Sequence, residues 1–352
     1  MRHPIIEEDL AFIIDQPVPW EDLRGRRVLI SGAYGFVVAY LVETLLYLNE
    51  RRNLGLQVYA LGRNLDKARR RFAHYWGRPD LTLLQRDVCD PVAVEGPVDY
   101  IIHGASLASP VSYGSQPVGS LLPNVLGTYR LLELAREKNS RGFLFLSSAE
   151  IYGRVEEAQV PTPETSCGCV DPLNVRSCYA ESKRMGETMC VAWYHQHGVP
   201  TTMARLFHTY GPGMALDDGR VFADFVRDVV ERRNIRMMSD GRHRRAFCYL
   251  ADAAVALLLI VLKGEPGQAY NMGNDEMEIS IRDLADVMVG LFPDRHLRVE
   301  QTGDNHPAGY LRTHIDRACP DTRRVRGLGW RPHFSVQEGF RRTVMSYEPT
   351  PN

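Results

Sequence analysis

The chain has 352 residues, of which 44% are hydrophobic and 24% charged, and its formal net charge at pH 7 is -1. This near-neutral balance gives no electrostatic reason to expect nucleic acid as a partner. The N-terminus carries acidic residues where a signal peptide would begin with basic ones, and the longest apolar run, residues 253–262, is too short to span a membrane, so neither export nor a membrane location is expected.

The seven cysteines are scattered without CxxC spacing, which predicts free thiols in a reducing compartment and therefore the cytoplasm. Cys167 and Cys169 are separated by one residue, as are His195 and His197, and neither pair matches a recognisable zinc motif. We therefore expect no metal site.

From Arg27 onward, short apolar runs alternate with longer amphipathic runs, as a parallel sheet with crossover helices requires. We predict strands at residues 26–32, 56–62, 81–88, 98–106, 142–148 and 201–212. Between them we predict helices at residues 37–52, 65–76, 125–139 and 179–198. Beyond residue 211 the alternation is less regular, with a helix at 221–233, a short strand, an apolar helix and a Pro- and Arg-rich tail.

These elements predict an α/β fold, namely a Rossmann-type doubly wound parallel sheet with a smaller C-terminal α/β cap. After an N-terminal extension at 1–26, the dinucleotide-binding domain occupies mainly residues 27–210 and the substrate-binding cap mainly residues 211–345, and the two interleave in sequence. Ligands of open α/β sheets bind at the carboxyl edge of the strands. The substrate is therefore expected between the sheet and the cap.

The first predicted strand is followed by the turn "SGAYGF", which places Gly32 and Gly35 between the strand and a helix. Glycines at such a turn let backbone amides and the helix N-terminus approach a pyrophosphate. We predict dinucleotide contacts at Gly32, Tyr34, Gly35 and Phe36, with a purely structural turn as the alternative. Val38 stands where a third glycine would allow close packing of the helix on the strand.

The second predicted strand ends at Gly62 and Arg63, where an acidic residue would hold the ribose 2′-hydroxyl of NAD. Arg63 could instead meet the 2′-phosphate of NADP or be a solvated charge, so the expected cofactor is NAD or NADP. Asp87 and Val88, at the end of the third strand, are candidate adenine contacts, with an exposed strand-end aspartate as the alternative.

The segment "YAESK" places Tyr179 and Lys183 four residues apart on one face of a predicted helix. A lysine ammonium beside a phenol favours the phenolate and lowers its pKa from about 10 toward the working pH, as a catalytic base requires. Ser147 and Ser148 supply hydroxyls from the end of a strand about thirty residues upstream. The alternative is that Tyr179 and Lys183 are two unrelated surface residues.

Eight motifs lie between Arg27 and Arg342, namely "SGAYGF", "DYIIHGAS", "NVLGTYRLLELA", "SSAEIYG", "YAESK", "TYGPG", "RRAFCYLAD" and "YNMGN". With them the chain resembles the extended short-chain dehydrogenase/reductases of the nucleotide-sugar epimerase/dehydratase group. The resemblance implies an enzyme in which Ser148, Tyr179 and Lys183 are catalytic and Lys183 also contacts the nicotinamide ribose. It further implies a nucleotide-diphosphate sugar as substrate, oxidised transiently at C4 by the nicotinamide.

Glu150 bears on the choice of reaction, since sugar decarboxylases and 4,6-dehydratases have a glutamate in the matching place. Dehydratases usually have Asp just before it, where this chain has Ala149. The chain is most similar to UDP-glucuronate decarboxylases, with Glu150 catalytic after oxidation and Arg176 as a carboxylate or loop partner, or alternatively a structural salt bridge. The alternative functions are a 4-epimerase, then a 4,6-dehydratase, a non-catalytic dinucleotide-binding scaffold and a net oxidoreductase.

Two positions depart from the decarboxylase pattern, which generally has Asn at His208 and Arg at Gly213. Arg245 matches a family arginine that usually contacts the diphosphate, a task that suits guanidinium geometry. The candidate substrate contacts are therefore Arg176, His208, Arg220 and Arg245.

The segments 124–139 and 179–196 have more apolar positions than burial on one side requires. Relatives in this family pair the two corresponding helices into a four-helix bundle. The resemblance therefore implies a homodimer.

Overall fold

The computed structural model describes residues 2–301, 303 and 315–349. Its largest sheet has seven strands in the order β10-β6-β5-β4-β1-β2-β3, all paired in parallel. The strands are β1 (Arg27–Ser31), β2 (Gln57–Gly62), β3 (Leu81–Gln85), β4 (Tyr100–His103), β5 (Gly142–Ser148), β6 (Thr201–Leu206) and β10 (Ala269–Met272). The predicted Rossmann-type sheet is confirmed, and its strand order reverses between β1 and β4, where such sheets bind ligands.

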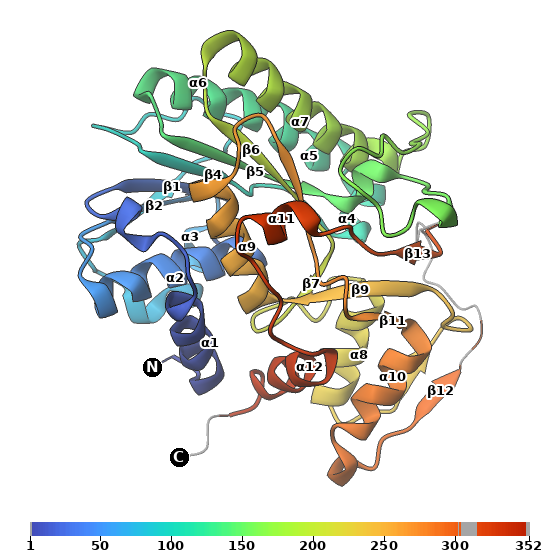
Figure 1. The fold of residues 1–352 in the computed structure, drawn as a ribbon. Coiled ribbons are helices and arrows are strands. Elements are labelled where there is room, and N and C mark those ends of the chain that lie inside the picture. Colours follow the sequence, from blue (N-terminus) through green and yellow to red (C-terminus); the bar gives the residue numbers. More distant parts are fainter. Residues whose placement is uncertain (1, 302, 304–314, 350–352) are drawn as a thin grey trace.

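Helices cover both faces of this sheet (Figure 1). On one face, α6 (Thr128–Lys138) packs on β4, α7 (Ser177–His197) packs on β5 and β6, and α5 (Pro117–Leu122) packs on α7. On the other face, α2 (Phe36–Arg52) packs on β1, and α9 (Leu250–Lys263) packs on β5 and β6. Because α1 (Pro4–Asp15) covers α9 from the side opposite the sheet, α9 is apolar on nearly all sides.

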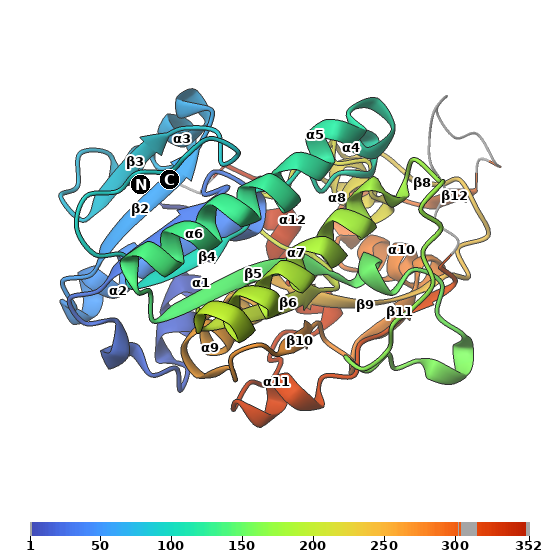
Figure 2. The same cartoon turned by 90° about the horizontal axis from the view of Figure 1, so that it is seen from above.

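A smaller body of structure follows the carboxyl end of β6 and forms the cap (Figures 1 and 2). In it, β9 (Arg244–Tyr249) pairs with β7 (His208–Tyr210), β11 (Glu278–Ser280) and β13 (Arg317–Ala318), and β8 (Ile235–Met237) pairs with β12 (Val299–Gln301). The helices α8 (Val221–Val230), α10 (Ile281–Gly290) and α12 (Val336–Met345) pack together beside these strands. The chain also returns from the cap to the main sheet through α9, β10 and α11 (Arg323–Gly327).

Two predicted elements are wrong in their extent. The strand expected at 201–212 is two strands in different sheets, because β6 pairs with β5 whereas β7 pairs with β9, and the buried Phe207 lies at the crossing. The helix expected at 65–76 ends as α3 (Leu65–Arg71) and is followed by a separate 3₁₀ turn at Ala73–Tyr75.

The N-terminal extension is part of the folded body, because α1 packs against α2 and α9. Asp9 on α1 is fully buried (0% exposed). Its carboxylate accepts hydrogen bonds from the hydroxyls of Tyr40 at 2.7 Å and Tyr249 at 2.6 Å, and from Nη2 of Arg342 at 2.6 Å. Since these partners lie on α2, at the end of β9 and on α12, one carboxylate joins the sheet to the cap.

Within the described residues, no helix is long and apolar enough to cross a membrane. All seven cysteines are free thiols, and the location in the cytoplasm stays a prediction. In the same part of the chain, no three His, Cys, Asp or Glu side chains gather in a group that could hold a metal ion.

Candidate active site

The glycine turn after β1 leaves its backbone open to close approach, and the backbone of Ala105 already lies against Gly32. Gly32 has a φ of +68°, which favours glycine, and a Cβ there would lie 2.6 Å from the Cα of Ala105. The N–H of Gly35 donates to the carbonyl of Gly32 at 2.8 Å, and α2 begins at Phe36 without a capping side chain. The first amides of α2 therefore suit an anion such as a pyrophosphate, and the contacts predicted for Gly32, Gly35 and Phe36 fit this geometry.

Val38 takes the place of the third glycine of the motif. The residue that its side chain faces on the sheet, Gly104, is the small one instead. A Cβ at Gly104, just after β4, would lie 2.9 Å from Cγ1 of Val38. Close packing of α2 on the sheet thus depends on Gly104, which the sequence analysis did not single out.

The side chain of Tyr34 is buried and makes its contacts within the protein. The hydroxyl donates to the carbonyl of Ala60 at 3.1 Å, and burial raises the pKa of this phenol to about 12. The ring lies against Gly62, where a Cβ would be 2.5 Å from Cε2 of Tyr34. The contact of Tyr34 with the cofactor stays a prediction, and the ring excludes any side chain at residue 62.

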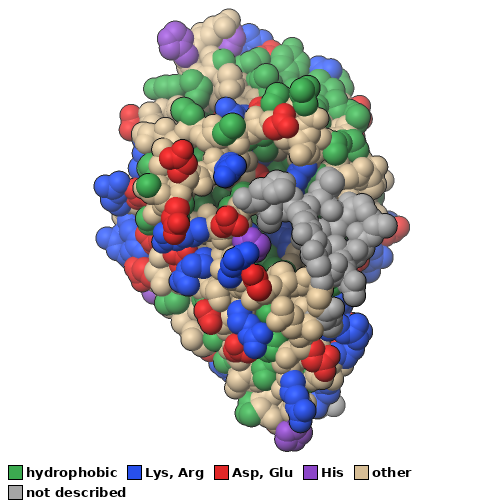
Figure 3. All heavy atoms as spheres, turned by 90° about the vertical axis from the view of Figure 1, so that its right-hand side faces the viewer, with side chains coloured by type: hydrophobic (Ala, Val, Ile, Leu, Met, Phe, Trp, Pro, Cys, Tyr) green, Lys and Arg blue, Asp and Glu red, His purple; other side chains and the backbone are tan. Residues whose placement is uncertain are grey.

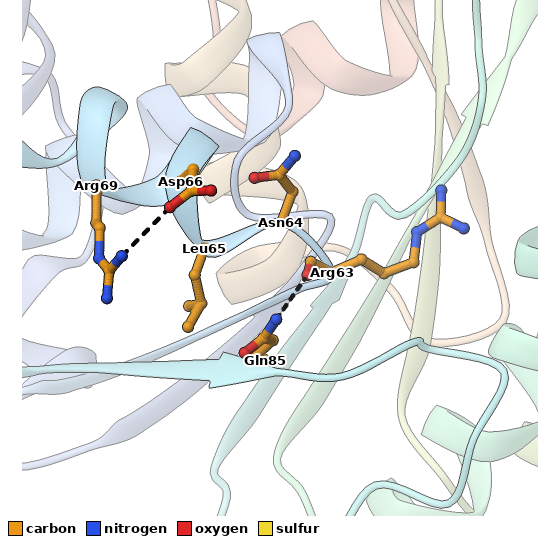
Figure 4. A pocket seen from close by; sticks show the side chains of 6 residues that line it. All are labelled: Arg63, Asn64, Leu65, Asp66, Arg69 and Gln85. Atoms are coloured by element: carbon orange, nitrogen blue, oxygen red, sulfur yellow. Dashed lines mark hydrogen bonds and ion pairs between the residues drawn. The ribbon is translucent and has the colours of Figure 1, made fainter.

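Arg63 and Asp87 meet at the carboxyl ends of β2 and β3, with 3.4 Å between Nη1 and Oδ2. Burial opposes ionisation of Asp87, but the N–H of Cys89 and the charge of Arg63 outweigh it and lower the pKa of the carboxyl. The side chain of Arg63 is 62% exposed and lies beside a shallow depression of about 630 Å³ (Figure 4). That depression is lined by Arg63, Asn64, Leu65, Asp66, Arg69 and Gln85.

Val88, predicted to contact adenine, is a buried residue next to Asp87. A Cβ at Gly127, at the end of the π turn before α6, would lie 2.8 Å from Cγ1 of Val88. The Val88 side chain therefore packs against the π turn, and the adenine contact stays a prediction.

Ser148 and Tyr179 come together where β5 ends and α7 begins. Tyr179 lies in the first turn of α7, is buried, and has its hydroxyl within hydrogen-bonding reach of the Ser148 hydroxyl. Burial raises the pKa of Tyr179 to about 12, although Ser148 and the charge of Arg220 act in the opposite direction. The ring of Tyr113, from α4 (Pro110–Ser115), stacks on the Tyr179 ring with centroids 4.8 Å apart.

Lys183 is one turn further along α7, with its Nζ 5.7 Å from the centroid of the Tyr179 ring. The Nζ donates to the carbonyl of Leu146 at 2.5 Å and lies 4.8 Å from the centroid of the Phe145 ring. Burial lowers the pKa of Lys183 to about 7, with Glu187 opposing this shift. Burial of the phenol outweighs the charges that act on it, so the lowering of the pKa of Tyr179 by Lys183 stays a prediction.

A π turn at Pro123–Gly127 brings Asn124 next to α7, a feature that sequence analysis missed. The Nδ2 of Asn124 donates to the Ser182 hydroxyl at 3.0 Å, and its buried Oδ1 has no hydrogen-bond partner among the described residues. The signal for this turn was Pro123, because proline removes a backbone donor inside a helical run.

His103, at the end of β4, holds this turn against the sheet. Its Nε2 lies 3.1 Å from the Pro123 carbonyl, which can only accept, so Nδ1 accepts from the Ser31 hydroxyl at 2.7 Å. Burial and then the charge of Lys183 lower the pKa of His103 to about 3. The imidazole is therefore neutral and structural.

Glu150 and Arg176 form an ion pair beside Ser148. Nη2 of Arg176 lies 3.0 and 3.1 Å from the two carboxylate oxygens of Glu150, and the backbone N–H of Glu150 donates to the Ser148 hydroxyl at 3.2 Å. The guanidinium of Arg176 also lies 5.7 Å from the centroid of the Tyr113 ring. Arg176 thus forms the salt bridge that was its alternative role, and the residue that it pairs with is Glu150, the predicted catalytic glutamate.

The other three predicted substrate contacts gather on the cap side. His208 on β7 is edge-on to Phe222 and Phe247, and its buried Nδ1 has no hydrogen-bond partner in the described part of the chain. Burial, and then the charges of Arg245 and Arg220, place the pKa of His208 well below its usual range. The imidazole is thus neutral and lies close to two arginines.

These two arginines hold backbone segments. Nη2 of Arg220 donates to the Ala108 carbonyl at 3.0 Å, which ties α8 to the segment before α4. Nη2 of Arg245 donates to the Ile315 carbonyl at 2.7 Å and its Nη1 to the Asp316 carbonyl at 3.0 Å. Their predicted roles in diphosphate binding stay predictions.

Comparison with known proteins identifies the family of this chain. Residues 28–273 match the model of the NAD dependent epimerase/dehydratase family. The chain belongs to that family. This membership confirms the resemblance predicted from the sequence and the dependence of the family on NAD.

Several members are similar over nearly the whole chain. UDP-glucuronic acid decarboxylase 5 of Arabidopsis thaliana is 33% identical over 318 residues, which cover 89% of this chain and 87% of that protein. UDP-glucuronic acid decarboxylase 1 of Danio rerio is 32% identical over 351 residues, which cover 99% of this chain and 79% of that protein. The crystal structure of dTDP-glucose 4,6-dehydratase from Bacillus anthracis in complex with NAD has the same fold, with a TM-score of 0.76, 18% identity, and coverage of 92% of this chain and 96% of that one.

Proposed function

We propose that this family member modifies a nucleotide-diphosphate sugar through transient oxidation at C4, and that UDP-glucuronate decarboxylation is the reaction it fits best. The observation that carries the proposal is the Glu150–Arg176 pair held beside Ser148 and Tyr179. The similarity to plant and animal UDP-glucuronic acid decarboxylases supports it.

The residues at the switch point fit a nicotinamide dinucleotide. The uncapped amides of α2 and the glycine turn before it would hold the pyrophosphate, and Lys183 would face the nicotinamide ribose. When bound, the oxidised nicotinamide supplies an acceptor for the hydride, which it later returns, and a positive charge that favours a phenolate nearby.

Tyr179 takes the proton of the C4 hydroxyl while C4 loses its hydride, and Ser148 orients that hydroxyl through a hydrogen bond. The product is a C4 ketone with a carboxylate on C5, which loses CO2 as the electrons of the broken bond pass into the ketone. A proton added at C5 and a hydride returned to C4 then complete the reaction. Glu150 is placed to act in the steps after oxidation.

A 4-epimerase is the second candidate, because the same C4 oxidation precedes transfer of the hydride back to the other face of the sugar. His208 and Gly213 depart from the decarboxylase pattern, which leaves room for a different nucleotide sugar as the substrate. Ala149, in place of the usual acid, disfavours a 4,6-dehydratase, and the close approach of Ser148 to Tyr179 disfavours a scaffold without activity.

Incubation with a panel of nucleotide sugars, followed by mass spectrometry and NMR, tests this proposal. Decarboxylation removes the mass of CO2 from UDP-glucuronate, dehydration removes the mass of water, and epimerisation leaves the mass unchanged but alters the NMR couplings. Stoichiometric consumption of free cofactor would identify a net oxidoreductase. Conversion of other sugars while UDP-glucuronate is left intact would overturn the decarboxylase assignment.

We propose that the ribose end of the cofactor site accepts a 2′-phosphate, so that NADP binds at least as well as NAD. Tyr34 excludes a side chain at Gly62, so no carboxylate stands there to hold a 2′-hydroxyl or repel a phosphate. Arg63 is largely exposed beside this position. A guanidinium suits a phosphate as a charged hydrogen-bond donor.

The variant Arg63→Ser is expected to weaken NADP binding by about tenfold or more and to leave NAD binding nearly unchanged. Calorimetric titration with NADP, NAD and adenosine 2′,5′-bisphosphate measures this difference. Arg69→Ser is the matched control, since Arg69 lines the same depression and, like Arg63, is exposed and pairs with an aspartate, Asp66, at 3.3 Å (Figure 4). Strict NAD binding by the unaltered protein would contradict the proposal.

We also propose a homodimer formed through α5, α6 and α7. Hydrophobic side chains gather over the upper part of the molecule in Figure 3, where Figure 1 places these helices. Six exposed side chains on or between them are apolar or aromatic, namely Val118, Leu122, Tyr129, Met185, Val191 and Tyr194. Burial of these side chains against a second copy would remove their apolar surface from water.

Light scattering at micromolar concentration is expected to give twice the chain mass of 39.9 kDa. Met185→Arg, which places a charge within the shared helix face, should shift the protein toward the monomer. Trp76→Arg is the control, because this exposed side chain lies outside the three helices. A monomeric mass for the unaltered protein would contradict the dimer.

A further inference from the structure

Cys167 and Cys169 place two free thiols at one turn. Both side chains are exposed, and only Gly168 separates them. The other five cysteines are at least partly buried. The spacing of this pair matches no zinc motif, and the proposed reaction does not use it. Two accessible thiols side by side suit thiol–disulfide exchange, because one can attack a disulfide and the other can resolve the mixed disulfide that results.

Backbone contacts fix the turn that carries these thiols. Gly168 has a φ of +63°, and a Cβ there would overlap the carbonyl of Tyr152. The N–H of Cys169 donates to that carbonyl at 3.2 Å, and the carbonyl of Cys169 accepts from the N–H of Arg154 at 3.0 Å. The two thiols therefore project from a turn whose backbone is held in place.

The same turn brings the two thiols toward each other. Two residues of fully extended chain separate their Cα atoms by about 7 Å, whereas a disulfide needs Cα atoms about 4.4–6.8 Å apart. The left-handed conformation of Gly168 bends the chain between the two cysteines, which shortens this separation. A disulfide between Cys167 and Cys169 is therefore compatible with the turn.

Both thiols line a depression of about 710 Å³, which is a volume typical of small-molecule sites. The depression lies between the segment 154–169 and residues 321–323. Within the described residues, none of the predicted cofactor or substrate contacts lines it. The candidate active site therefore does not account for this depression.

Charged side chains of both signs surround the thiols. Asp321 and Arg323 pair with each other at 2.5 Å. The side chains of Arg154 and Glu156, in contrast, form no hydrogen bond or ion pair within the described residues. A guanidinium suits a carboxylate, and a carboxylate suits an ammonium group. The depression therefore fits a ligand that carries both a carboxylate and an ammonium group.

We propose that this depression binds an acidic low-molecular-weight disulfide of the γ-glutamyl peptide class, for which glutathione disulfide is the probe, and that Cys167 and Cys169 exchange with it. Each half of that probe carries two carboxylates and one ammonium group. The inference does not depend on the proposed function.

The exchange proceeds in two steps that conserve atoms and electrons. The thiolate of one cysteine attacks a sulfur of the ligand, the S–S bond of the ligand breaks, and one glutathione leaves as a thiolate that takes up a proton. The second cysteine then attacks the sulfur of the first, which releases the other glutathione and leaves a disulfide between Cys167 and Cys169. The protein loses two electrons and two protons, and the ligand gains them as two thiols. In a reducing compartment this disulfide is transient.

Peptide mapping by mass spectrometry, after the reduced protein is incubated with glutathione disulfide, tests the exchange. The peptide that contains Cys167 and Cys169 should lose two hydrogen atoms. The partly buried thiols of Cys89 and Cys178 should stay unmodified. Cys167→Ser and Cys169→Ser should each retain one glutathione as a mixed disulfide, because the resolving thiol is missing. Unmodified thiols at both positions, or equal modification of Cys89 and Cys178, would overturn the proposal.

A second comparison distinguishes a binding site from two thiols that are merely exposed. 2-Hydroxyethyl disulfide reacts by the same chemistry but carries no charge, so the ratio of the two exchange rates measures recognition of the charged ligand. This ratio should fall about threefold in Arg154→Ser. It should not change in Arg70→Ser, which alters an exposed arginine on α3 outside the depression. The same ratio in the unaltered protein and in both variants would overturn the binding of an acidic ligand.

Discussion

Replacing Tyr179 by phenylalanine is expected to lower turnover by about 10²-fold or more, while cofactor and nucleotide sugar still bind. The substitution removes the phenolic proton acceptor beside Ser148 with little change in volume, and the ring stacked against Tyr113 is retained. Hydride transfer then lacks a base for the C4 hydroxyl. Single-turnover absorbance of the reduced cofactor measures the effect, and titration calorimetry checks binding.

Glu150→Gln separates the later steps from this first one. If Glu150 acts after oxidation, the variant still forms reduced cofactor, which accumulates with bound substrate while the final product falls. Tyr194→Phe, at an exposed position on the same helix, serves as the tyrosine control and should turn over normally. Turnover near the native rate in Tyr179→Phe would show that the catalytic assignment is wrong.

Asp9→Ala is expected to lower the free energy of unfolding by about 3–5 kcal/mol. The substitution leaves the guanidinium of Arg342 without its buried partner and leaves the hydroxyls of Tyr40 and Tyr249 without an acceptor. Urea unfolding, followed by circular dichroism, measures the change in the free energy of unfolding.

Glu8 offers a matched control, because it pairs with the same Arg342 at 3.0 Å but its side chain is 64% exposed. An exposed ion pair contributes little, so Glu8→Ala should change the free energy of unfolding by less than about 1 kcal/mol. Equal effects of the two substitutions would refute the role given to the buried carboxylate.

Six of the seven strands of the parallel sheet were predictable because each is a short apolar run between turns and helices, as in β5, where all residues are buried. The seventh strand, β10, was not predicted. The division of residues 201–212 into two strands was not predictable, because both halves are rich in residues that favour β-strands. Only the pairing of His208–Tyr210 with a strand about forty residues later moves that half into another sheet. The packing of α1 was hidden for a similar reason, since the partner of Asp9 on α12 is 333 residues away.

Within the site, helix spacing predicted that Tyr179 and Lys183 share one face, and the strand end before them supplied two serines. The resemblance to the family selected Ser148. The direction of the pKa shift of Tyr179 did not follow, because spacing along a helix carries no information about burial. Tyr113 and Asn124 were missed because a stacked ring and a π turn depend on tertiary contacts. The ion pair of Glu150 and Arg176 joins residues that are 26 positions apart, which no local pattern indicates.

The carboxylate of Asp9 also sets an order of events during biosynthesis. Helix α1 leaves the ribosome before Arg342 is made, because 333 positions separate Asp9 from this arginine. At about 5–20 residues per second, the 333 residues between them take on the order of 20–60 s to translate. Throughout that time Asp9 lacks its cation. The carboxylate network that joins the sheet to the cap therefore forms only after α12 has been made, so the sheet and the cap cannot complete their folding one after the other.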